Sequence, residues 1–352
     1  MTITVVIPTR DRPSQLSEAL RSVLGQSHEQ TEVVVVDDGS DARHAQAYRD
    51  VENWAPARVR FIHLAPVPRG HGASFARNIG AARSTGTYLT FIDDDDVLTD
   101  MSYLERAMAA VADGDPVDLH LSDQVAFAGG VRVERKIWIE DLRDRLDDAP
   151  AADAVGAHVV TPSMLLACTG FAHLNTTVVS RVLFDAIGGF DEAQRYESDR
   201  DFYLRAIDRA RVIKYSPFYV ARHNVPDPQR GTNVSTALPM MDRAAFQLRL
   251  LNKAASSARP EVSACAGRHR VYALKRIAES FYFQRDFFGA RRHAWAALAS
   301  RFTLKWLGFC LLATMRSAVA QPEPARVGVQ PGPLAAYMVM PVTVPRAPGA
   351  LS

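Results

Sequence analysis

The sequence predicts an α/β fold, and three observations support that prediction. Short β-branched runs alternate with amphipathic helical stretches from the first residues onward. The strand-like runs are apolar almost throughout, which is typical of parallel strands covered on both faces. Two of these runs end in consecutive aspartates. Because the carboxyl ends of parallel strands meet at one edge of a sheet, we expect the aspartates to share that edge.

The composition is that of an ordinary globular protein. The chain has 352 residues, of which 47% are hydrophobic and 23% charged. A net charge of +2 argues against a dedicated nucleic-acid binder. The three cysteines are widely spaced and form no zinc or disulfide pattern, which favours a reducing compartment. The start does not resemble a signal peptide. We therefore expect a cytoplasmic protein, with peripheral contact to the inner face of a membrane left open.

The first unit is predicted to be strand, helix, strand. Residues 3–7 are a β-branched run that ends at Pro8, and residues 13–24 carry an apolar stripe at helical spacing. Residues 32–36 form a second apolar run, which ends in Asp37 and Asp38. A plain turn would also explain the sequence Asp-Asp-Gly-Ser at that point.

The second unit ends in four aspartates. Residues 59–64 predict a third strand, a loop rich in Gly and Pro follows, and residues 74–83 predict a helix. Residues 87–92 then predict a buried strand that ends in Asp93 to Asp96. Four crowded carboxylates repel one another, and bound Mg²⁺ or Mn²⁺ would relieve the repulsion. A solvated acidic loop is the alternative.

Four blocks together resemble the family-2 glycosyltransferases. The blocks read IPTRDRP, VVVVDDGS, ARNIGAARSTGTYLTFIDDDD and IGGFDE, and their order and spacing match over residues 2–225. The resemblance implies the GT-A fold, which is a Rossmann-like mixed, mostly parallel sheet flanked by helices. It also implies a nucleotide-diphosphate sugar as donor, a DXD motif that binds a metal, and inversion at the anomeric carbon.

The resemblance assigns the nucleotide side of the site. Pro8, Thr9 and Arg10 begin the nucleotide pocket, and Asp38 accepts a hydrogen bond from the base, with uracil or thymine favoured. Arg77 lies near the nucleotide or its phosphates, although pairing with a nearby aspartate is an equal alternative. Arg10 is a departure, since the family often has an aromatic residue there. A guanidinium plane can stack on a base as well.

The resemblance also assigns roles within the four aspartates. Asp93 matches the residue near the ribose or sugar, Asp95 matches the metal ligand, and Asp94 is expected to contribute to the donor site. Four identical residues leave the register of these roles open.

The third unit supplies the predicted base. Residues 117–121 predict a strand, and Gly129-Gly130 predict a hairpin turn between residues 124–128 and 131–136. Acidic residues crowd the start of a helix predicted over 199–210, where complementing the helix dipole is their default role. The resemblance favours Asp199 as catalytic base, with Asp201 and Glu197 as alternatives. Ser198 stands where the family has a partner acid.

Residues 212–215 and 218–221 predict two strands that lead to His223. The resemblance suggests that His223 contacts the metal or a phosphate, and a surface histidine is the alternative. Arg230, in the following loop, is a second candidate for contact with a phosphate.

The composition changes near residue 238, so we expect a catalytic domain over 1–235 and a helical region over 236–320. Four helices are predicted at about 239–256, 264–284, 287–300 and 303–319. The last could lie on a membrane surface, pack on the catalytic domain or join a homodimer. Residues 321–352 are Pro-rich and predict a loosely ordered tail.

The function predicted from these observations is a metal-dependent inverting glycosyltransferase. It would move a sugar from a UDP- or TDP-sugar to a hydroxyl of a glycan, a lipid-linked acceptor or a small natural product. A sugar-nucleotide-binding or scaffolding protein of the same fold is the alternative, because Ser198 replaces an acid.

Overall fold

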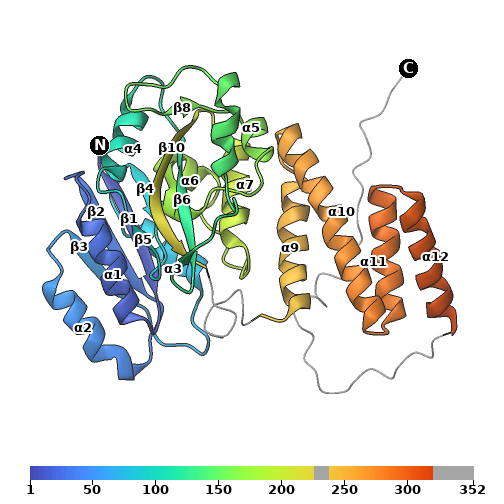
Figure 1. Ribbon diagram of the computed structural model, residues 1–352. Helices are drawn as coiled ribbons and strands as arrows, with labels where there is room; N and C mark the ends of the chain where they lie inside the picture. The colour runs from blue at the N-terminus through green and yellow to red at the C-terminus, as the bar shows by residue number, and fades with distance from the viewer. Residues whose placement is uncertain (226–237, 320–352) are drawn as a thin grey trace, which may run out of the picture. The chain divides into compact units, whose positions relative to one another are not determined.

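The computed structural model of the protein describes residues 1–225 and 238–319 (Figure 1). Two predictions, Arg230 and the tail over 321–352, lie outside the described residues. Contacts divide the chain into two compact units. Unit 1 comprises residues 1–237 and 253–266, and unit 2 comprises residues 238–252 and 267–352.

Unit 1 is built on one mixed sheet, in the order β3-β2-β1-β4-β9-β6-β10-β5. The strands are β1 Ile3–Thr9, β2 Thr31–Asp37, β3 Val59–His63, β4 Tyr88–Phe91, β5 Val97–Leu98, β6 Leu119–Ala128, β7 Val131–Arg132, β8 His158–Val159, β9 Thr177–Ser180 and β10 Ile213–Asn224. The first four strands are parallel, β9 is antiparallel to both of its neighbours, and β10 is parallel to β6. The prediction of a mixed, mostly parallel sheet is confirmed.

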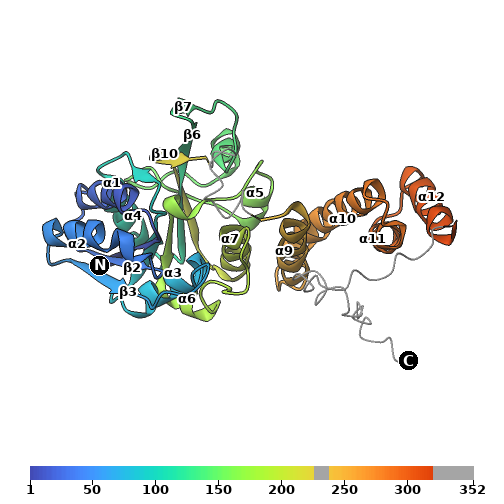
Figure 2. The same ribbon diagram turned by 90° about the horizontal axis from the view of Figure 1, so that it is seen from below.

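Helices cover both faces of the sheet (Figure 2). The α-helices of this part are α1 Pro13–Leu24, α2 Ala45–Trp54, α3 Ala73–Ala82, α4 Tyr103–Ala112, α5 Pro162–Leu166, α6 Arg181–Ala186 and α7 Ser198–Arg209. Three 3-10 helices, η1 Ala42–His44, η2 Glu140–Asp148 and η3 Leu174–Thr176, lie in the connections. In Figure 2, α1 and α4 lie on one face, and α3 and α6 lie on the other.

The apolar strands follow from this layering. Ile3, Val5 and Ile7 of β1 point into a core cluster shared with α1 and α4. The neighbouring residues of β2, Val34 and Val36, pack under α3 on the opposite face. Since successive side chains alternate between faces and both faces are buried, most positions of these strands are apolar.

The register of the strands brings the acidic residues to one edge. Thr9 at the end of β1 pairs with Asp37 at the end of β2, and Val6 pairs with Phe91 at the end of β4. Asp38 and the run Asp93 to Asp96 therefore follow β2 and β4, the two neighbours of β1, at the same edge, as predicted.

One prediction in this region is wrong. Residues 212–215 and 218–221 are not two strands but parts of the single strand β10. Its pairing with β6 shifts register between Ser216 and Ala221, around Pro217, which has no backbone N–H to donate. The predicted hairpin is confirmed, since β6 and β7 pair across Gly129-Gly130, although β7 has only two residues.

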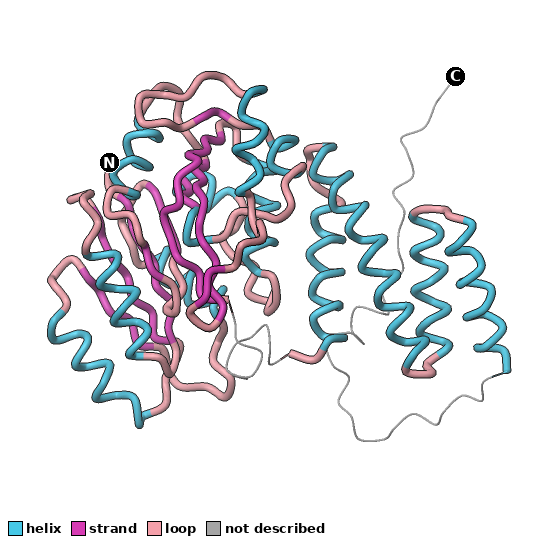
Figure 3. Tube along the Cα trace, in the orientation of Figure 1, coloured by secondary structure: helices cyan, strands magenta, loops and turns pink. Residues whose placement is uncertain are grey.

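The helical prediction for the carboxyl-terminal part is confirmed (Figure 3). The helices are α9 Met240–Ala254, α10 Pro260–Phe283, α11 Phe287–Ser300 and α12 Leu304–Val319. In unit 2, a core of Leu274, Ala278, Ala294, Trp306 and Cys310 joins α10, α11 and α12. Among the described residues, no helix is both long and apolar enough to cross a bilayer.

Candidate active site

Exposure alternates along the four aspartates that follow β4. The side chains of Asp93 and Asp95 are 28% and 30% exposed, whereas those of Asp94 and Asp96 are 7% and 0% exposed. Two carboxylates separated by one residue are thus accessible to a ligand, and the other two face the protein. Exposure thus separates Asp93 and Asp95 from Asp94 and Asp96.

Asp94 and Asp95 both form an ion pair with Arg12, which lies in the loop after β1. Arg12 Nη1 lies 3.1 Å from Asp94 Oδ1 and 2.9 Å from Asp95 Oδ2. Thr9 also donates a hydrogen bond of 2.8 Å to Asp94. The importance of Arg12 was not evident from the sequence, although its motif, Thr-Arg-Asp-Arg, placed it next to the predicted pocket.

Nearby positive charge does not offset the burial and mutual repulsion of Asp94 and Asp95, so the pKa of each is raised. Burial raises the pKa of Asp94 to about 6, although Arg12 and Thr9 favour its charged form. Burial and the neighbouring Asp96, Asp94 and Asp93 raise the pKa of Asp95 to about 7. Accessible, crowded carboxylate oxygens of this kind are the donors that Mg²⁺ and Mn²⁺ prefer, so the residues fit a divalent cation.

Arg77 pairs with an aspartate, Asp93, which is one of the two roles that the sequence left open for it. Its guanidinium donates a hydrogen bond to Asp93 and lies 5.4 Å from the ring centre of Phe190. Burial disfavours the charge on Asp93, but Arg77 and two histidines outweigh it and lower the pKa to about 2. Arg77 thereby keeps Asp93 ionised.

The carboxylate of Asp96 is fully buried, and its hydrogen bonds link the segment after β4 to the end of β10 and to η3. Its Oδ2 accepts hydrogen bonds from His223 Nδ1 at 2.8 Å and from Asn175 Nδ2 at 2.6 Å, and its Oδ1 accepts from the backbone N–H of Asn224 at 2.8 Å. Burial lowers the pKa of His223, but Asp96 more than compensates and raises it to about 9. His223 is therefore no free surface histidine.

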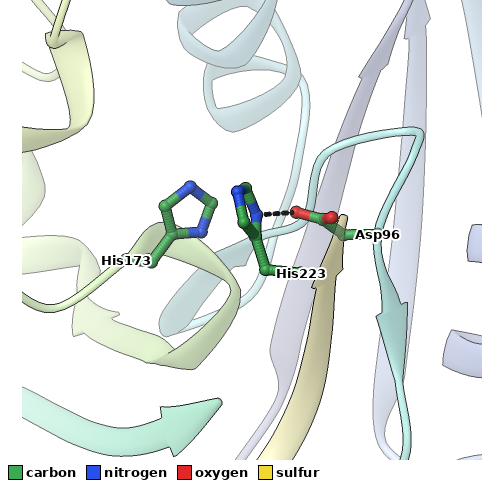
Figure 4. A group of neighbouring side chains, drawn as sticks. All are labelled: Asp96, His173 and His223. Carbon is green, nitrogen blue, oxygen red and sulfur yellow. Dashed lines mark hydrogen bonds and ion pairs between the residues drawn. The ribbon is translucent and has the colours of Figure 1, made fainter. Parts of the chain in front are cut away.

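His173 joins this group (Figure 4). The ligand atoms of Asp96, His173 and His223 lie within 4.8 Å of one another, and the two imidazole centres are 4.6 Å apart. Burial and the neighbouring His223 lower the pKa of His173. Its Nδ1 is buried without a hydrogen-bond partner among the described residues. A lone histidine in the loop before β9 carries no sequence pattern, so nothing pointed to it beforehand.

The three acidic candidates near the start of α7 have different surroundings. Asp199 Oδ2 lies 3.8 Å from Nε2 of His173, a member of the group just described. Asp201 is 2% exposed and bonds to Arg205 and to Lys253 Nζ, the latter at 2.6 Å. Glu197 has a left-handed backbone, with φ of 53°, and pairs with Arg200 at 3.2 Å. Of the three, Asp199 is the one that faces the site.

Asp38 organises the loop between β3 and α3. Its carboxylate accepts hydrogen bonds from the backbone N–H groups of His71, at 2.9 Å, and Gly72, at 2.8 Å, and from His71 Nδ1 at 2.9 Å. A Cβ added at Gly70 would lie 2.2 Å from Arg10 Nη1 and 2.5 Å from Asp38 Oδ2. The backbone of this loop thus approaches both predicted nucleotide-pocket side chains closely, which only glycine permits.

A cavity lies at the other edge of the sheet. It has a volume of about 370 Å³ and lies beside Lys214 near the start of β10. The ammonium of Lys214 is satisfied there by Asp153 Oδ2 at 2.8 Å and by the carbonyl of Ala110 at 2.9 Å. Lys214 is thus paired within this cavity, with Asp153 and Asp113, and the accessible carboxylates after β4 lie at the opposite edge.

Comparisons with known proteins relate this chain to glycosyltransferases. Residues 4–135 match the model of the family described as glycosyl transferase family 2. An uncharacterized glycosyltransferase of Nostoc sp. is 37% identical over 97 residues, which are 28% of this chain and 29% of the relative. The pre-mycofactocin glycosyltransferase of Mycobacterium tuberculosis is 27% identical over 225 residues, which are 63% of this chain and 42% of the relative. The chain thus spans less than half the length of these relatives.

Two solved structures share the fold. TarS of S. aureus, residues 1–349 in complex with UDP-GlcNAc, has a TM-score of 0.58 and 19% identity over 89% of this chain and 79% of that one. The mannosyltransferase PcManGT of Pyrobaculum calidifontis, in complex with GDP-Man and Mn²⁺, has a TM-score of 0.54 and 20% identity over 91% of this chain and 81% of that one. The GT-A fold predicted from the motifs is confirmed, and the match over residues 4–135 supports the predicted resemblance to family-2 glycosyltransferases.

Proposed function

We propose that the protein is a metal-dependent inverting glycosyltransferase that uses a nucleotide-diphosphate sugar. The observation that carries the proposal is the pair of accessible carboxylates, Asp93 and Asp95, at the same strand edge as Asp38, with Asp199 facing that site through His173. One edge of the sheet then offers a place for a base, a diphosphate and a reacting sugar. The donors named for the two solved structures support a nucleotide sugar.

Asp95 and His223 would hold the divalent cation. Asp96 accepts the Nδ1 proton of His223, which fixes the ring and leaves Nε2 as the ligand atom. Mg²⁺ or Mn²⁺ would supply positive charge next to the diphosphate leaving group. Arg12 already contacts Asp95, so it can also approach that diphosphate, and its fork suits anionic oxygens.

The nucleotide would lie against β1 and the loop after β3. Pro8 and Thr9 end β1, and Arg10 lies beside Asp38. Asp38 Oδ2 accepts one hydrogen bond, from Gly72, and an oxygen has capacity for a second, which the N–H of uracil or thymine could provide. We therefore favour UDP- or TDP-sugars. Arg77 and Asp94 act behind this surface, since both are buried and paired with neighbours.

Asp199 would act as the catalytic base. An acceptor hydroxyl is a poor nucleophile, and a carboxylate within hydrogen-bond reach removes its proton as the new bond forms between its oxygen and the anomeric carbon. The bond from that carbon to the diphosphate oxygen breaks in the same step. A single displacement inverts the configuration at carbon and requires no covalent intermediate. The acceptor would be a hydroxyl of a glycan, a lipid-linked glycan or a small natural product.

Release of nucleoside diphosphate tests the proposal. The purified chain is incubated with UDP-, TDP- and GDP-sugars, with and without Mn²⁺, and with a panel of hydroxyl acceptors. We expect release from one donor class only when Mn²⁺ is present, loss of that release in Asp199→Asn, and a product of inverted configuration by NMR. Donor binding without release or transfer under any condition would favour the scaffolding alternative, which Ser198 in place of an acid suggests.

A further inference from the structure

The last described helix of unit 2, α12, is apolar on the side that faces away from its own core. Trp306, Cys310, Ala313 and Ser317 of α12 are buried. On the opposite side, Leu304, Leu311, Met315 and Val319 are 78%, 50%, 68% and 82% exposed. These four residues are spaced by seven, four and four positions, so they lie on one side of the helix. We call them, together with Leu312, the outer face of α12.

A helix that is apolar all round normally lies in a core, and the end of a helical stack normally presents a polar side. The outer face of α12 instead presents a contiguous row of large apolar side chains. Contiguous exposed apolar surface marks an interaction site. The question is which partner suits its chemistry.

The charged residues of α11 and α12 are all basic. Residues 287–319, which span α11 and α12, contain five basic residues and no Asp or Glu. Lys305 and Arg316 are exposed, and because they are eleven positions apart they lie along the same flank of the outer face. None of the five basic residues forms an ion pair within the described part of the chain. They are Arg291, Arg292, Arg301, Lys305 and Arg316.

We propose that the outer face of α12 docks on an anionic lipid bilayer, with the helix lying in the plane of the interface. The leucine and methionine side chains would enter the boundary between headgroups and acyl chains. Lys305 and Arg316 would reach the lipid phosphates from its flank. Phe302, 63% exposed between Arg301 and the helix, adds an aromatic contact of the kind found at membrane interfaces.

A second copy of the chain fits this surface less well. A symmetric contact places the same patch on both sides, so two sets of basic residues would face one another without an acidic partner in 287–319. An anionic surface removes that repulsion. The proposal is independent of the proposed reaction, because it rests on no residue of the site after β4.

Vesicle sedimentation of the full chain tests the proposal. Wild type is mixed with vesicles of phosphatidylcholine alone or of phosphatidylcholine with phosphatidylglycerol, at low and high salt. We expect binding to the mixed vesicles, weaker binding at high salt, and little binding to phosphatidylcholine alone. Lys305→Gln with Arg316→Gln should weaken binding by roughly fivefold per charge removed. Leu311→Gln with Met315→Gln should weaken it by at least about tenfold.

The matched control replaces two equally exposed apolar residues of unit 1. Met101→Gln with Val182→Gln, at positions 68% and 73% exposed, should leave vesicle binding unchanged. The molar mass of each variant is measured by light scattering. Equal vesicle binding by wild type and the α12 variants, or no binding by wild type, would overturn the proposal. A wild-type dimer that Leu311→Gln with Met315→Gln converts to monomer, without vesicle binding, would assign the outer face to a second copy instead.

Discussion

His173 Nε2 lies 3.8 Å from Asp199 Oδ2, and the other side of the same imidazole faces His223. His173 thus stands between the residue that we propose as the base and the residue that we propose as a metal ligand. Trp138, whose ring centre is 6.2 Å from that of His173, borders the group. One buried ring thus lies beside both the proposed proton acceptor, Asp199, and the proposed metal ligand, His223.

Replacing the base should remove turnover and spare donor binding. In Asp199→Asn the carboxylate that accepts the proton is lost while the shape is kept, so we expect the rate of transfer to fall by about 10²- to 10⁴-fold. The affinity for the nucleoside diphosphate should stay within about twofold of wild type, since Asp199 lies beside His173 rather than in the nucleotide pocket. Steady-state kinetics and calorimetry measure the two effects separately.

Asp201→Asn is the matched control for that variant. The same chemical change two residues away removes charge from a buried ion pair with Arg205 and Lys253. We expect a lower melting temperature, with the rate per folded molecule largely retained. A normal melting temperature together with complete loss of turnover in Asp201→Asn would assign the base to Asp201 and contradict our assignment.

The accessible and the buried aspartates should respond differently to truncation. Asp95→Ala removes a carboxylate that its neighbouring aspartates repel. The free energy of unfolding should therefore be unchanged or slightly higher. Asp96→Ala leaves the imidazole of His223 buried without its partner and should cost about 3–5 kcal/mol of unfolding free energy. Denaturant titration measures both. Similar losses of stability in the two variants would mean that the division between ligand-facing and supporting aspartates is wrong.

His63 should make stability depend on pH. Burial opposes its charge, but Asp37 and Glu52, which contact its two ring nitrogens, raise its pKa above 6.5. A raised pKa in the folded state stabilises the protein fully below pH 6.5, and the contribution disappears as the pH rises through the folded-state pKa. Because His63 is largely exposed, the contribution should be only about 0.5 kcal/mol.

The measurement for His63 is denaturant unfolding of wild type and His63→Gln at two pH values. The difference in unfolding free energy between the two proteins should be larger at acidic pH than at alkaline pH. A difference that does not vary with pH, or that grows as the pH rises, would show that the two carboxylates do not hold a charged imidazole.

Two helical glycines should respond oppositely to alanine. A Cβ at Gly80 would lie 2.4 Å from Val6 Cγ1, because α3 packs directly on the sheet, so Gly80→Ala should cost about 1–3 kcal/mol. Among the described residues, no atom beyond the neighbouring backbone of α10 lies within 4 Å of a Cβ added at Gly267. Gly267→Ala should therefore stabilise the protein by up to about 1 kcal/mol. Thermal unfolding of both variants is the test, and destabilisation by Gly267→Ala would contradict the packing described for α10.

Much of the fold was predictable because its signals are local. Apolar runs such as Val33 to Val36 require a strand buried on both faces, and the register of parallel strands then brings their acidic ends together. The helical periodicity of residues 287–319 likewise predicted α11 and α12. The prediction of two strands separated at Pro217 was wrong because β10 pairs with β6 on both sides of that residue. Such long-range pairing is not contained in local strand propensity.

The site was predictable only in part. Four identical residues carry no register. Which of them is buried depends on Thr9 of β1 and Arg12 of the following loop, which bond to Asp94, and on Asn175 of η3, which bonds to Asp96. His173 lies 50 residues before its neighbour His223 in the sequence, and only the fold brings their rings together. The sequence left Arg77 with two possible partners, the nucleotide or a nearby aspartate. Its hydrogen bond to Asp93 depends on three-dimensional proximity, which the sequence does not show.

The central claim is that Asp95 belongs to a metal-dependent nucleotide site. Calorimetric titration of UDP, TDP and GDP, each with and without Mn²⁺, into wild type and Asp95→Ala tests it most directly. The account predicts that wild type binds UDP or TDP only when Mn²⁺ is present, and that Asp95→Ala abolishes this binding without loss of fold. Binding that is equally tight without metal, or equally tight in Asp95→Ala, would contradict it.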